Sequence, residues 1–262
     1  MNARLALPQV TLCAASSVNV EATVHALERC MAAADFGAAM LFTDDVDVLL
    51  PPGIRRVPIA PLRSSQAYSL FMLRELGDWV ETSHCLVVQW DGFIINPGLW
   101  DVRFLDYDYI GASWPQFGDG HDVGNGGFSL RSRSLIDACR TARFRYDGEA
   151  EDLAICRTNR AMLEAEHGLR FADKDMADRF SAERRGSVRT AFGFHGAFNL
   201  IDAVGACAFW DIYDKLNHRT ALRVDFWSIL GKLLRHRAIG PAIRFARKEY
   251  RTGDGVANAS GA

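Results

Sequence analysis

Short apolar runs that alternate with segments of helical spacing restrict the fold of this chain more than any other feature. Runs of strand length occupy residues 10–15, 39–42 and 85–88, and the segment from Val20 to Met31 has the spacing of a helix with one buried face. This alternation is typical of βαβ units, which build a largely parallel sheet with helices on its faces. We therefore predict an α/β fold with a mixed, mainly parallel sheet flanked by helices.

Turn and capping signals predict the shorter elements. Proline cannot donate to a β ladder, so Pro58 marks residues 56–59 as an edge strand, and Ser64 or Ser65 is expected to cap the next helix. Residues 104–111 alternate between polar and apolar types, which predicts a half-exposed strand. Further predictions are a strand at 126–130 and helices at 135–140, 152–165 and 200–213.

The composition excludes several classes of protein. The chain has 262 residues, 49% of them hydrophobic, and a formal net charge of −2, which does not suit a general nucleic-acid binder. Its apolar runs are shorter than the roughly 20 residues of a membrane span. The six cysteines form no CxxC pair, which indicates buried free thiols in a reducing compartment. Because Pro8 and Gln9 interrupt the first apolar segment, we expect no secretion signal and a cytoplasmic protein.

Polar residues follow three of the predicted strands, at 16–17, 43–45 and 89–91. In open α/β sheets, ligands bind beyond the carboxyl ends of the strands. Two oxygen ligands spaced like Gln89 and Asp91 can hold a divalent cation that bridges two phosphates. A turn-capping role for Asp91 explains the same residues, so this motif alone leaves both interpretations open.

Five motifs in a fixed order resemble a bacterial family of unknown function. They are Gln89–Phe93, Tyr107–Ala112, Gly124–Arg131, Glu151–Asp152 and Phe194–Gly196, and the resemblance covers about residues 10–200. That family in turn resembles the GT-A glycosyltransferases, which have a Rossmann-like fold and transfer a sugar from a nucleotide-diphosphate donor. The resemblance implies a GT-A-like domain over residues 1–214.

The resemblance implies a metal site at Asp91 and His195. Asp91 stands where GT-A enzymes have the last acid of their DxD motif, which binds the metal and, through it, the donor diphosphate. Gln89 stands at the first acid and supplies an amide oxygen without charge. His195 resembles the C-terminal histidine of several GT-A families, although a lone histidine is more often structural. The implied cofactors are Mn²⁺ or Mg²⁺, with a nucleotide-sugar donor such as a UDP-sugar.

The resemblance also implies a pocket for the donor sugar and the acceptor at Asn125, Gly126 and Gly127. Glycines remove side chains where a strand passes close to a ligand, and an ordinary glycine turn is the alternative. Trp114 offers an aromatic ring that can stack on a sugar face, and a buried core position is the alternative.

Glu151 and Asp152 are the candidate catalytic bases. Carboxylates in a first helical turn are also favoured by the helix dipole. An inverting transfer requires a base within reach of the acceptor hydroxyl, and GT-A families with a Glu-Asp pair after the glycine segment place it there. We favour Asp152, with Glu151 as the alternative.

The remaining predicted contacts are with the donor nucleotide. Ser16, Ser17 and Asp44 are expected to contact the nucleoside. Arg74 is expected to neutralise the diphosphate, because a guanidinium matches phosphate geometry. A surface salt bridge to neighbouring acids is the alternative for Arg74.

The C-terminal segment differs in charge from the rest of the chain. Between Arg223 and Arg251, eight Lys or Arg residues stand against two acids, a net charge of +6 that leaves −8 for the rest of a chain with −2 in total. We predict a basic amphipathic helical appendage over 215–251, broken at Gly240-Pro241, and a disordered tail over 252–262. The appendage either lies on an anionic membrane surface or packs with a solvated basic face.

These features predict a metal-assisted, inverting glycosyltransferase that acts on a glycan or lipid-linked acceptor in cell-surface polysaccharide synthesis. Its expected location is the cytoplasm, with peripheral contact to the inner face of the membrane through residues 223–251. Because Gln89 replaces an acid, the alternative is a non-catalytic sugar- or nucleotide-binding protein on a GT-A-like fold. A nucleotidyltransferase is disfavoured, because the loop after the first strand, 16–19, has neither glycine nor a basic residue.

Overall fold

The computed structural model describes residues 4–253 and divides into two compact units. The first unit ends at His195 and the second begins at Gly196. The predicted boundary lies after residue 214, and the helix expected at 200–213 lies in the second compact unit. Residues 254–262 of the predicted tail lie outside the described residues.

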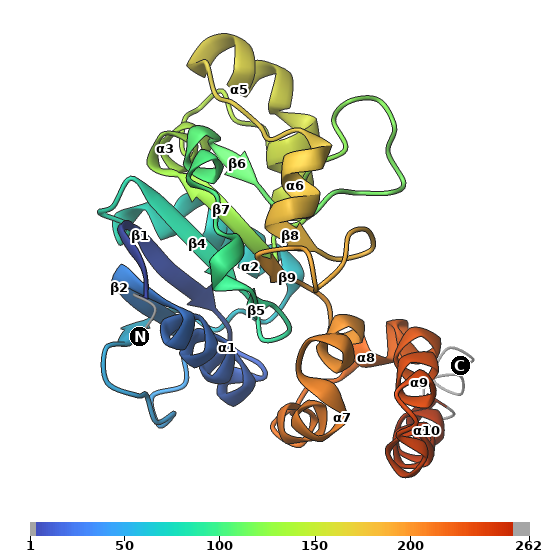
Figure 1. The fold of residues 1–262 in the computed structure, drawn as a ribbon. Helices are drawn as coiled ribbons and strands as arrows, with labels where there is room; N and C mark the ends of the chain where they lie inside the picture. The colour runs from blue at the N-terminus through green and yellow to red at the C-terminus, as the bar shows by residue number, and fades with distance from the viewer. Residues whose placement is uncertain (1–3, 254–262) are drawn as a thin grey trace, which may run out of the picture. The chain divides into compact units, whose positions relative to one another are not determined.

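The first unit is built on a six-stranded mixed sheet with the strand order β3-β2-β1-β4-β7-β6 (Figure 1). Strands β3, β2, β1 and β4 are parallel, whereas β7 runs antiparallel to both β4 and β6. The strands are β1 (Leu5–Ala15), β2 (Ala34–Thr43), β3 (Arg55–Pro58), β4 (His84–Val88), β6 (Tyr109–Ile110) and β7 (Phe128–Ser132). The predicted mixed, mainly parallel sheet is confirmed, with β3 at its edge.

A second, three-stranded sheet has the order β5-β9-β8. Its strands are β5 (Phe93–Ile94), β8 (Ser181–Ala182) and β9 (Gly193–Phe194). Strand β9 pairs antiparallel with β5 and parallel with β8. This small sheet pairs β5, which follows β4 in the chain, with β9 at the end of the first unit.

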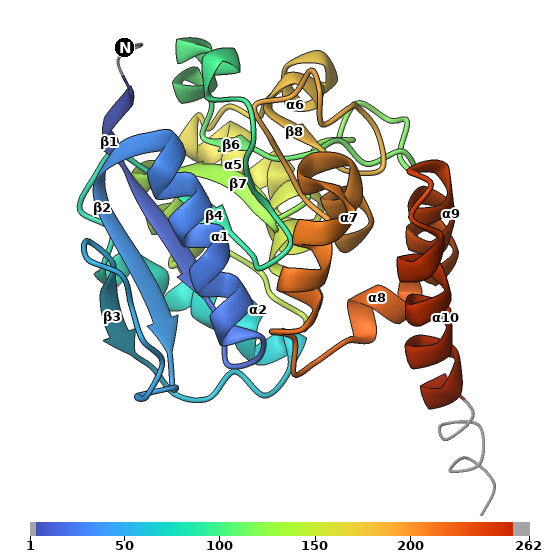
Figure 2. The same ribbon diagram turned by 60° about the horizontal axis from the view of Figure 1, so that its bottom comes forward.

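Helices cover both faces of the large sheet. Helix α1 (Val20–Ala33) packs against β1 and β2 on one face. Helices α2 (Ser65–Arg74) and α3 (Arg133–Cys139) contribute Phe71, Met72 and Ile136 to a buried cluster on the other face. Figure 2 shows α1 in front of the strands and α2 behind them. Ser64 caps α2 as predicted, because its side chain accepts the N–H of Ala67.

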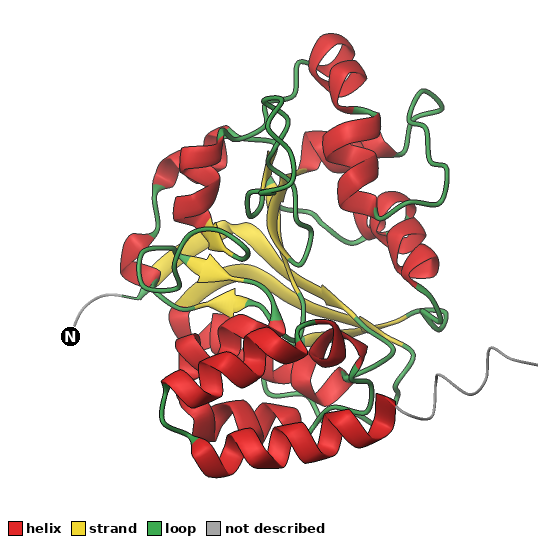
Figure 3. Cartoon of the chain, turned by 90° about the vertical axis from the view of Figure 1, so that its right-hand side faces the viewer, coloured by secondary structure: helices red, strands yellow, loops and turns green. Residues whose placement is uncertain are grey.

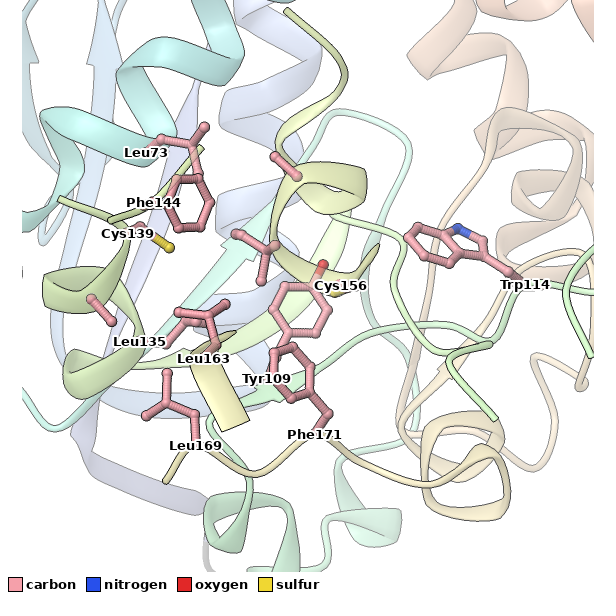
Figure 4. Packing of buried hydrophobic residues seen from close by; sticks show 13 residues of the cluster. Leu73, Tyr109, Trp114, Leu135, Cys139, Phe144, Cys156, Leu163, Leu169 and Phe171 are labelled. Carbon is pink, nitrogen blue, oxygen red and sulfur yellow. The ribbon is translucent and has the colours of Figure 1, made fainter. Parts of the chain in front are cut away.

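The remaining helices of the first unit follow, and the first two of them pack around a second buried cluster. They are α4 (Glu151–Leu153), α5 (Arg160–His167) and α6 (Lys174–Phe180), with a π-helical turn at Ala154–Thr158 between the first two. Figure 4 shows Tyr109 beside Phe171 in this cluster, where the two rings stack 6.2 Å apart. The helix predicted at 152–165 is therefore present but interrupted. Five of the six cysteines are buried, and all six are free.

The strand predicted at 104–111 is wrong over most of its length. Val102–Asp106 is a 3₁₀ helix, capped by the side chain of Asp101, and only Tyr109–Ile110 forms a strand. Phe104 is fully buried against the rings of Trp100 and other aromatic residues. The strand prediction failed because a single buried aromatic residue between acids gives the same sequence pattern as a half-exposed strand.

The second unit is helical. Its helices are α7 (Leu200–Tyr213), α8 (Thr220–Val224), α9 (Phe226–Arg235) and α10 (Ile239–Gly253), and Figure 3 shows the helices of the chain in red. The break predicted at Gly240-Pro241 falls earlier, at 236–238, where Arg237 has φ 56°. Pro241 does not interrupt α10, because it lies in the first turn of that helix, where its missing N–H is not needed. Of the helices in residues 4–253, none combines the length and the apolar composition that a membrane span requires.

Substituting Gly111 should destabilise the first unit. A Cβ at Gly111 would lie 2.0 Å from the carbonyl oxygen of Gly124 and 2.4 Å from that of Asn125, and backbone atoms cannot move aside cheaply. Gly111→Ala should therefore lower the free energy of unfolding by about 3 kcal/mol, measured by chemical denaturation. Gly98→Ala is the matched control, because nothing lies within 4 Å of its Cβ position. Equal stability of the two variants would contradict the close backbone contact that we describe at Gly111.

Candidate active site

The candidate site lies where the order of the large sheet reverses. The chain leaves β1 for β2 and β3 on one side and returns to β4 on the other, so the carboxyl ends of β1 and β4 are neighbours. Open α/β sheets bind ligands at this position. Residues 16–17 follow β1 and residues 89–91 follow β4, so the fold brings two of the predicted polar segments to one edge.

Gly126 and Gly127 reach the same edge from the antiparallel strand β7. Phe128, the first residue of β7, pairs with Val88, the last residue of β4. The N–H of Gln89 donates to the carbonyl oxygen of Gly127 at 3.0 Å. The glycine pair therefore lies directly beside the residues that follow β4.

The small sheet brings the side chains of Asp91 and His195 together. Phe93 pairs with Phe194 in the antiparallel ladder of β5 and β9, so the residues just before β5 face the residue just after β9. Oδ1 of Asp91 lies 3.4 Å from Nε2 of His195, and Asp91 is only 5% exposed. The convergence that we predicted for these two side chains is observed.

Two glycines make room for the His195 ring. A Cβ on Gly127 would lie 2.1 Å from Nε2 of His195, and a Cβ on Gly92 would lie 3.3 Å from Cδ2 of the same ring. The first distance is far shorter than any real Cβ contact. A side chain at residue 127 would therefore displace the imidazole from Asp91.

Glu183 contacts the other nitrogen of the His195 ring. Its Oε1 lies 3.4 Å from Nδ1, and the N–H of His195 donates to the carbonyl oxygen of Ala182 at 2.9 Å. Burial lowers the pKa of the imidazole, but the carboxylates of Asp91 and Glu183 outweigh it and raise the pKa of His195 to about 10. Glu183 was not predicted, because the two-residue strand β8 that positions it has no sequence pattern of its own.

Asp91, Gln89 and His195 are the side chains at this edge that could hold a divalent cation. Oδ1 of Asp91 is buried and has no hydrogen-bond partner within the described residues. Oε1 of Gln89 lies 3.3 Å from Nε2 of His195, close to the 3.4 Å between that nitrogen and Asp91. Neighbouring ligand atoms around an octahedral Mg²⁺ ion are about 3 Å apart. Within residues 4–253 no three His, Cys, Asp or Glu side chains form a metal cluster, so Gln89 would be the third protein ligand.

Tyr68 orients the Gln89 amide. Nε2 of Gln89 donates to the hydroxyl oxygen of Tyr68, on α2, at 3.2 Å. This hydrogen bond directs the amide oxygen toward His195. Burial raises the pKa of Tyr68 well above its usual range, so its hydroxyl stays protonated.

Asp152 lies on the other side of the glycine pair. The N–H of Gly126 donates to its Oδ2 at 2.9 Å, and the N–H of Leu153 donates to its Oδ1 at 2.8 Å. Burial and the neighbouring carboxylate of Glu151 raise the pKa of Asp152 to about 6. A half-buried carboxylate with this pKa is ionised at neutral pH and can accept a proton.

Glu151 is held in an ion pair instead. It is 4% exposed, and its Oε1 accepts a hydrogen bond from Nη2 of Arg131 at 2.9 Å. A Cβ on Gly126 would lie 2.4 Å from the same oxygen, so glycine at this position leaves space for the pair. Of the two candidate bases, the geometry favours Asp152.

Asn125 shapes the turn that carries the glycines. Its Oδ1 accepts the N–H of Gly127 at 3.1 Å, and its own φ is 27°, in the left-handed region that asparagine tolerates. The side-chain oxygen of Asn125, a residue that we predicted at the sugar and acceptor pocket, is therefore hydrogen-bonded to the chain itself.

Ser16, Ser17 and Asp44 lie at neighbouring strand ends, because Ala15 pairs with Phe42. The hydroxyl of Ser17 accepts the N–H of Leu62, which follows β3, at 2.8 Å, and the hydroxyl of Ser16 donates to the carbonyl oxygen of Val18. All three side chains are half-buried. The fold thus brings the predicted nucleoside contacts to the edge that also carries Gln89.

Arg74 and Trp114 are not placed as predicted. The guanidinium of Arg74 donates to the carbonyl oxygen of Cys139 at 2.6 Å and lies 5.7 Å from the ring centre of Phe144, which directs it toward the end of α3. Trp114 is 7% exposed, and its ring lies against Gly124, where a Cβ would be 2.0 Å away. A ring buried in this way has no free face for a sugar, so the core alternative describes Trp114.

The fold and this edge of the sheet define an α/β protein with an acidic, histidine-containing site at the switch point of its sheet. A model of a family described as a protein of unknown function, DUF5672, matches residues 53–195. The chain belongs to this family, in agreement with the predicted membership of a family of unknown function. The matched segment includes Asp91, the glycine pair, Asp152 and His195, whereas Ser16, Ser17 and Asp44 precede it.

Among solved structures, a glycosyltransferase involved in the glycosylation of the major capsid of PBCV-1 aligns with a TM-score of 0.45 and 10% identity, over 78% of this chain and 98% of its own. HddC from Yersinia pseudotuberculosis aligns with a TM-score of 0.34 and 12% identity, over 56% of this chain and 84% of its own. No curated protein sequence matches significantly.

The His195 imidazole of the metal-free protein should stay protonated well above neutral pH. Its pKa of about 10 exceeds the ordinary 6.5, so the ion pairs stabilise the fold fully below pH 6.5 and this stabilisation is lost as the pH rises toward 10. Nitrogen NMR of labelled histidine would follow the ring directly. Asp91→Asn should lower the pKa of His195 by about one to two pH units, and Asp211→Asn, an exposed control, should not change it. A ring that loses its proton near pH 6.5 in the unaltered protein would contradict this geometry.

Proposed function

We propose that this protein transfers a sugar from a nucleoside-diphosphate donor to a hydroxyl group of a glycan or lipid-linked acceptor. One observation carries the proposal. A buried carboxylate and an imidazole, Asp91 and His195, lie 3.4 Å apart on one side of Gly126-Gly127, and Asp152 lies on the other side, hydrogen-bonded to Gly126. A site of this kind offers a position for a diphosphate and a base for an acceptor at one sheet edge.

The donor diphosphate would lie beside Asp91, Gln89 and His195. These three side chains would hold Mn²⁺ or Mg²⁺, which when bound neutralises the charge that develops on the leaving diphosphate. Glu183 would hold the His195 ring from its other nitrogen, as carboxylates do for many metal-bound histidines. The nucleoside would extend toward the strand ends at 16–17 and Asp44. Arg74 has no part in this proposal, because its guanidinium is engaged at α3.

Asp152 would act as the base. The acceptor hydroxyl gives its proton to the Asp152 carboxylate while its oxygen bonds to the anomeric carbon, and the bond from that carbon to the diphosphate breaks on the opposite face. The product sugar is inverted and the nucleoside diphosphate leaves. The N–H groups of Gly126 and Leu153 hold the carboxylate in one orientation during this step.

The proposed setting is the synthesis of cell-surface polysaccharide in the cytoplasm, where nucleotide sugars are available. The second candidate is a non-catalytic sugar- or nucleotide-binding protein. The observation that favours it is Gln89, whose neutral amide replaces a charged ligand and lies beside a ring already neutralised by two carboxylates. Binding without turnover in the experiments below would support this second candidate.

Donor binding can be tested by the metal dependence of the thermal shift. Nucleoside diphosphates and UDP-sugars with Mn²⁺ should stabilise the protein by about 2.7 kcal/mol at a concentration 100 times the dissociation constant, and by less without the metal. Asp91→Ala should abolish the part of this shift that depends on Mn²⁺, and Asp211→Ala should preserve it. Equal metal-dependent shifts in all three proteins would remove Asp91 from the donor site.

Asp152→Asn should separate donor binding from turnover. We expect the variant to retain the thermal shift with the donor while kcat falls by about 100-fold or more, because the amide cannot accept the proton. In the unaltered protein, kcat should rise with pH and level off above about pH 6, where Asp152 is ionised. Transfer that survives in Asp152→Asn would assign the base elsewhere.

The same variant has a predicted effect on stability. The folded-state pKa of Asp152 is raised, so the protein loses stability as the pH rises from the ordinary value of 3.8 through about 6. Asp152→Asn removes this pH-dependent loss, so the stability of the variant relative to the unaltered protein should be on the order of 2 kcal/mol higher at pH 7 than at pH 3. Denaturation at the two pH values would measure the difference, with Asp211→Asn as the control.

A further inference from the structure

Helices α9 and α10 each carry two apolar stripes. The inner stripes are buried: Ile229 and Leu233 on α9 are 0% exposed, and Ala242 and Phe245 on α10 are 2% and 0% exposed. The rings of Phe226 and Phe245 stack 5.3 Å apart and join the two helices. These stripes account for the packing of the second unit.

The outer stripes face away from this packing. On α9, Trp227, Leu230 and Leu234 repeat at the spacing of one helix face; Trp227 and Leu234 are 76% and 53% exposed, and Leu230 is half-buried. On α10, the residues on the equivalent face are Ile239, Ile243 and Tyr250, which are 62%, 49% and 68% exposed. Single exposed apolar residues are ordinary, but two helices with an ordered exposed stripe each mark an interaction surface. We call these six residues the outer face.

The basic residues of the second unit also fall into two groups, one paired with acids inside the unit and one exposed. Lys232 pairs with Asp202 of α7 at 2.5 Å, Arg244 pairs with Asp214 at 3.2 Å, and Arg223 pairs with the buried Glu249 at 3.3 Å. Part of the basic charge therefore holds the helices together.

Three arginines remain outside this arrangement. Arg235, Arg237 and Arg247 are exposed and form no ion pair within the described residues. Arg235 ends α9, and Arg247 lies on α10 between Ile243 and Tyr250. Over residues 220–250, the only acids are Asp225, which is half-buried, and Glu249, which is 4% exposed. The exposed charged residues beside the outer face, Arg235, Arg237 and Arg247, are therefore all basic.

We propose that the outer face binds the surface of an anionic lipid bilayer. Its aliphatic and aromatic side chains would enter the boundary between headgroups and acyl chains, and Arg235, Arg237 and Arg247 would contact the lipid phosphates. A second copy of this chain fits less well, because a two-fold interface would bring like charges together. The proposal concerns the second unit alone and does not depend on the reaction proposed for the first.

The test is cosedimentation of the full chain with lipid vesicles. We expect binding to vesicles of phosphatidylcholine with phosphatidylglycerol, weaker binding to phosphatidylcholine alone, and loss of the difference at high salt. Arg235→Gln combined with Arg247→Gln should weaken binding about 25-fold, because each arginine near an anionic surface contributes about fivefold. Trp227→Ser combined with Ile243→Ser should weaken it by about tenfold on both kinds of vesicle. Leu49→Ser, an 89% exposed site in the first unit, is the control and should bind normally.

Three results would overturn the proposal. The first is no binding of the unaltered chain to anionic vesicles at low salt. The second is equal binding of all variants. The third is a dimer in sedimentation velocity that Trp227→Ser dissociates, since a second copy would then cover the outer face. Circular dichroism of each variant would show that the helices remain folded, so a loss of binding reports on the surface itself.

Discussion

The contact between the His195 ring and the carboxylates of Asp91 and Glu183 depends on the small sheet, and the candidate site depends on that contact. Pairing of β5 with β9 determines which residue faces Asp91, and pairing of β8 with β9 determines which residue lies behind the ring. Gly92 and Gly127 then leave the space that the ring fills. The protonated ring is therefore the counterion of the buried Asp91 carboxylate.

The mainly parallel character of the large sheet was predictable because its causes are local. Apolar runs at 10–15, 39–42 and 85–88 had the length and composition of buried strands, and the intervening helix from Val20 showed a single buried face. Parallel strands place their carboxyl ends together, so the polar residues after them could be expected at one edge. Asp91 could be expected at the site for this reason, whereas Asp152 on α4 and His195 after β9 were predicted only from the order of the motifs.

Contacts that arise from distant packing were not predictable in the same way. Arg74 was expected at a diphosphate because of its charge, but carbonyl groups exposed at the end of α3 lie within its reach. Trp114 was offered as a platform for a sugar, whereas Gly124 accommodates its ring in a buried position. Glu183 went unnoticed because an acid after a two-residue strand has no distinguishing pattern. Each case depends on residues far away in the chain, which no local periodicity describes.

The ion pair of Arg131 with Glu151 determines how the next residue behaves. Because Glu151 cancels most of the cationic charge nearby, Asp152 keeps an affinity for protons that an acid beside an unopposed arginine would lose. Of the two consecutive acids on α4, Glu151 is therefore the fixed counterion of Arg131, and Asp152 is the carboxylate that can exchange a proton. A neutral side chain at position 151 would make its neighbour a stronger acid and a poorer proton acceptor. The basicity of the site is therefore tuned by a residue that is sealed off from solvent.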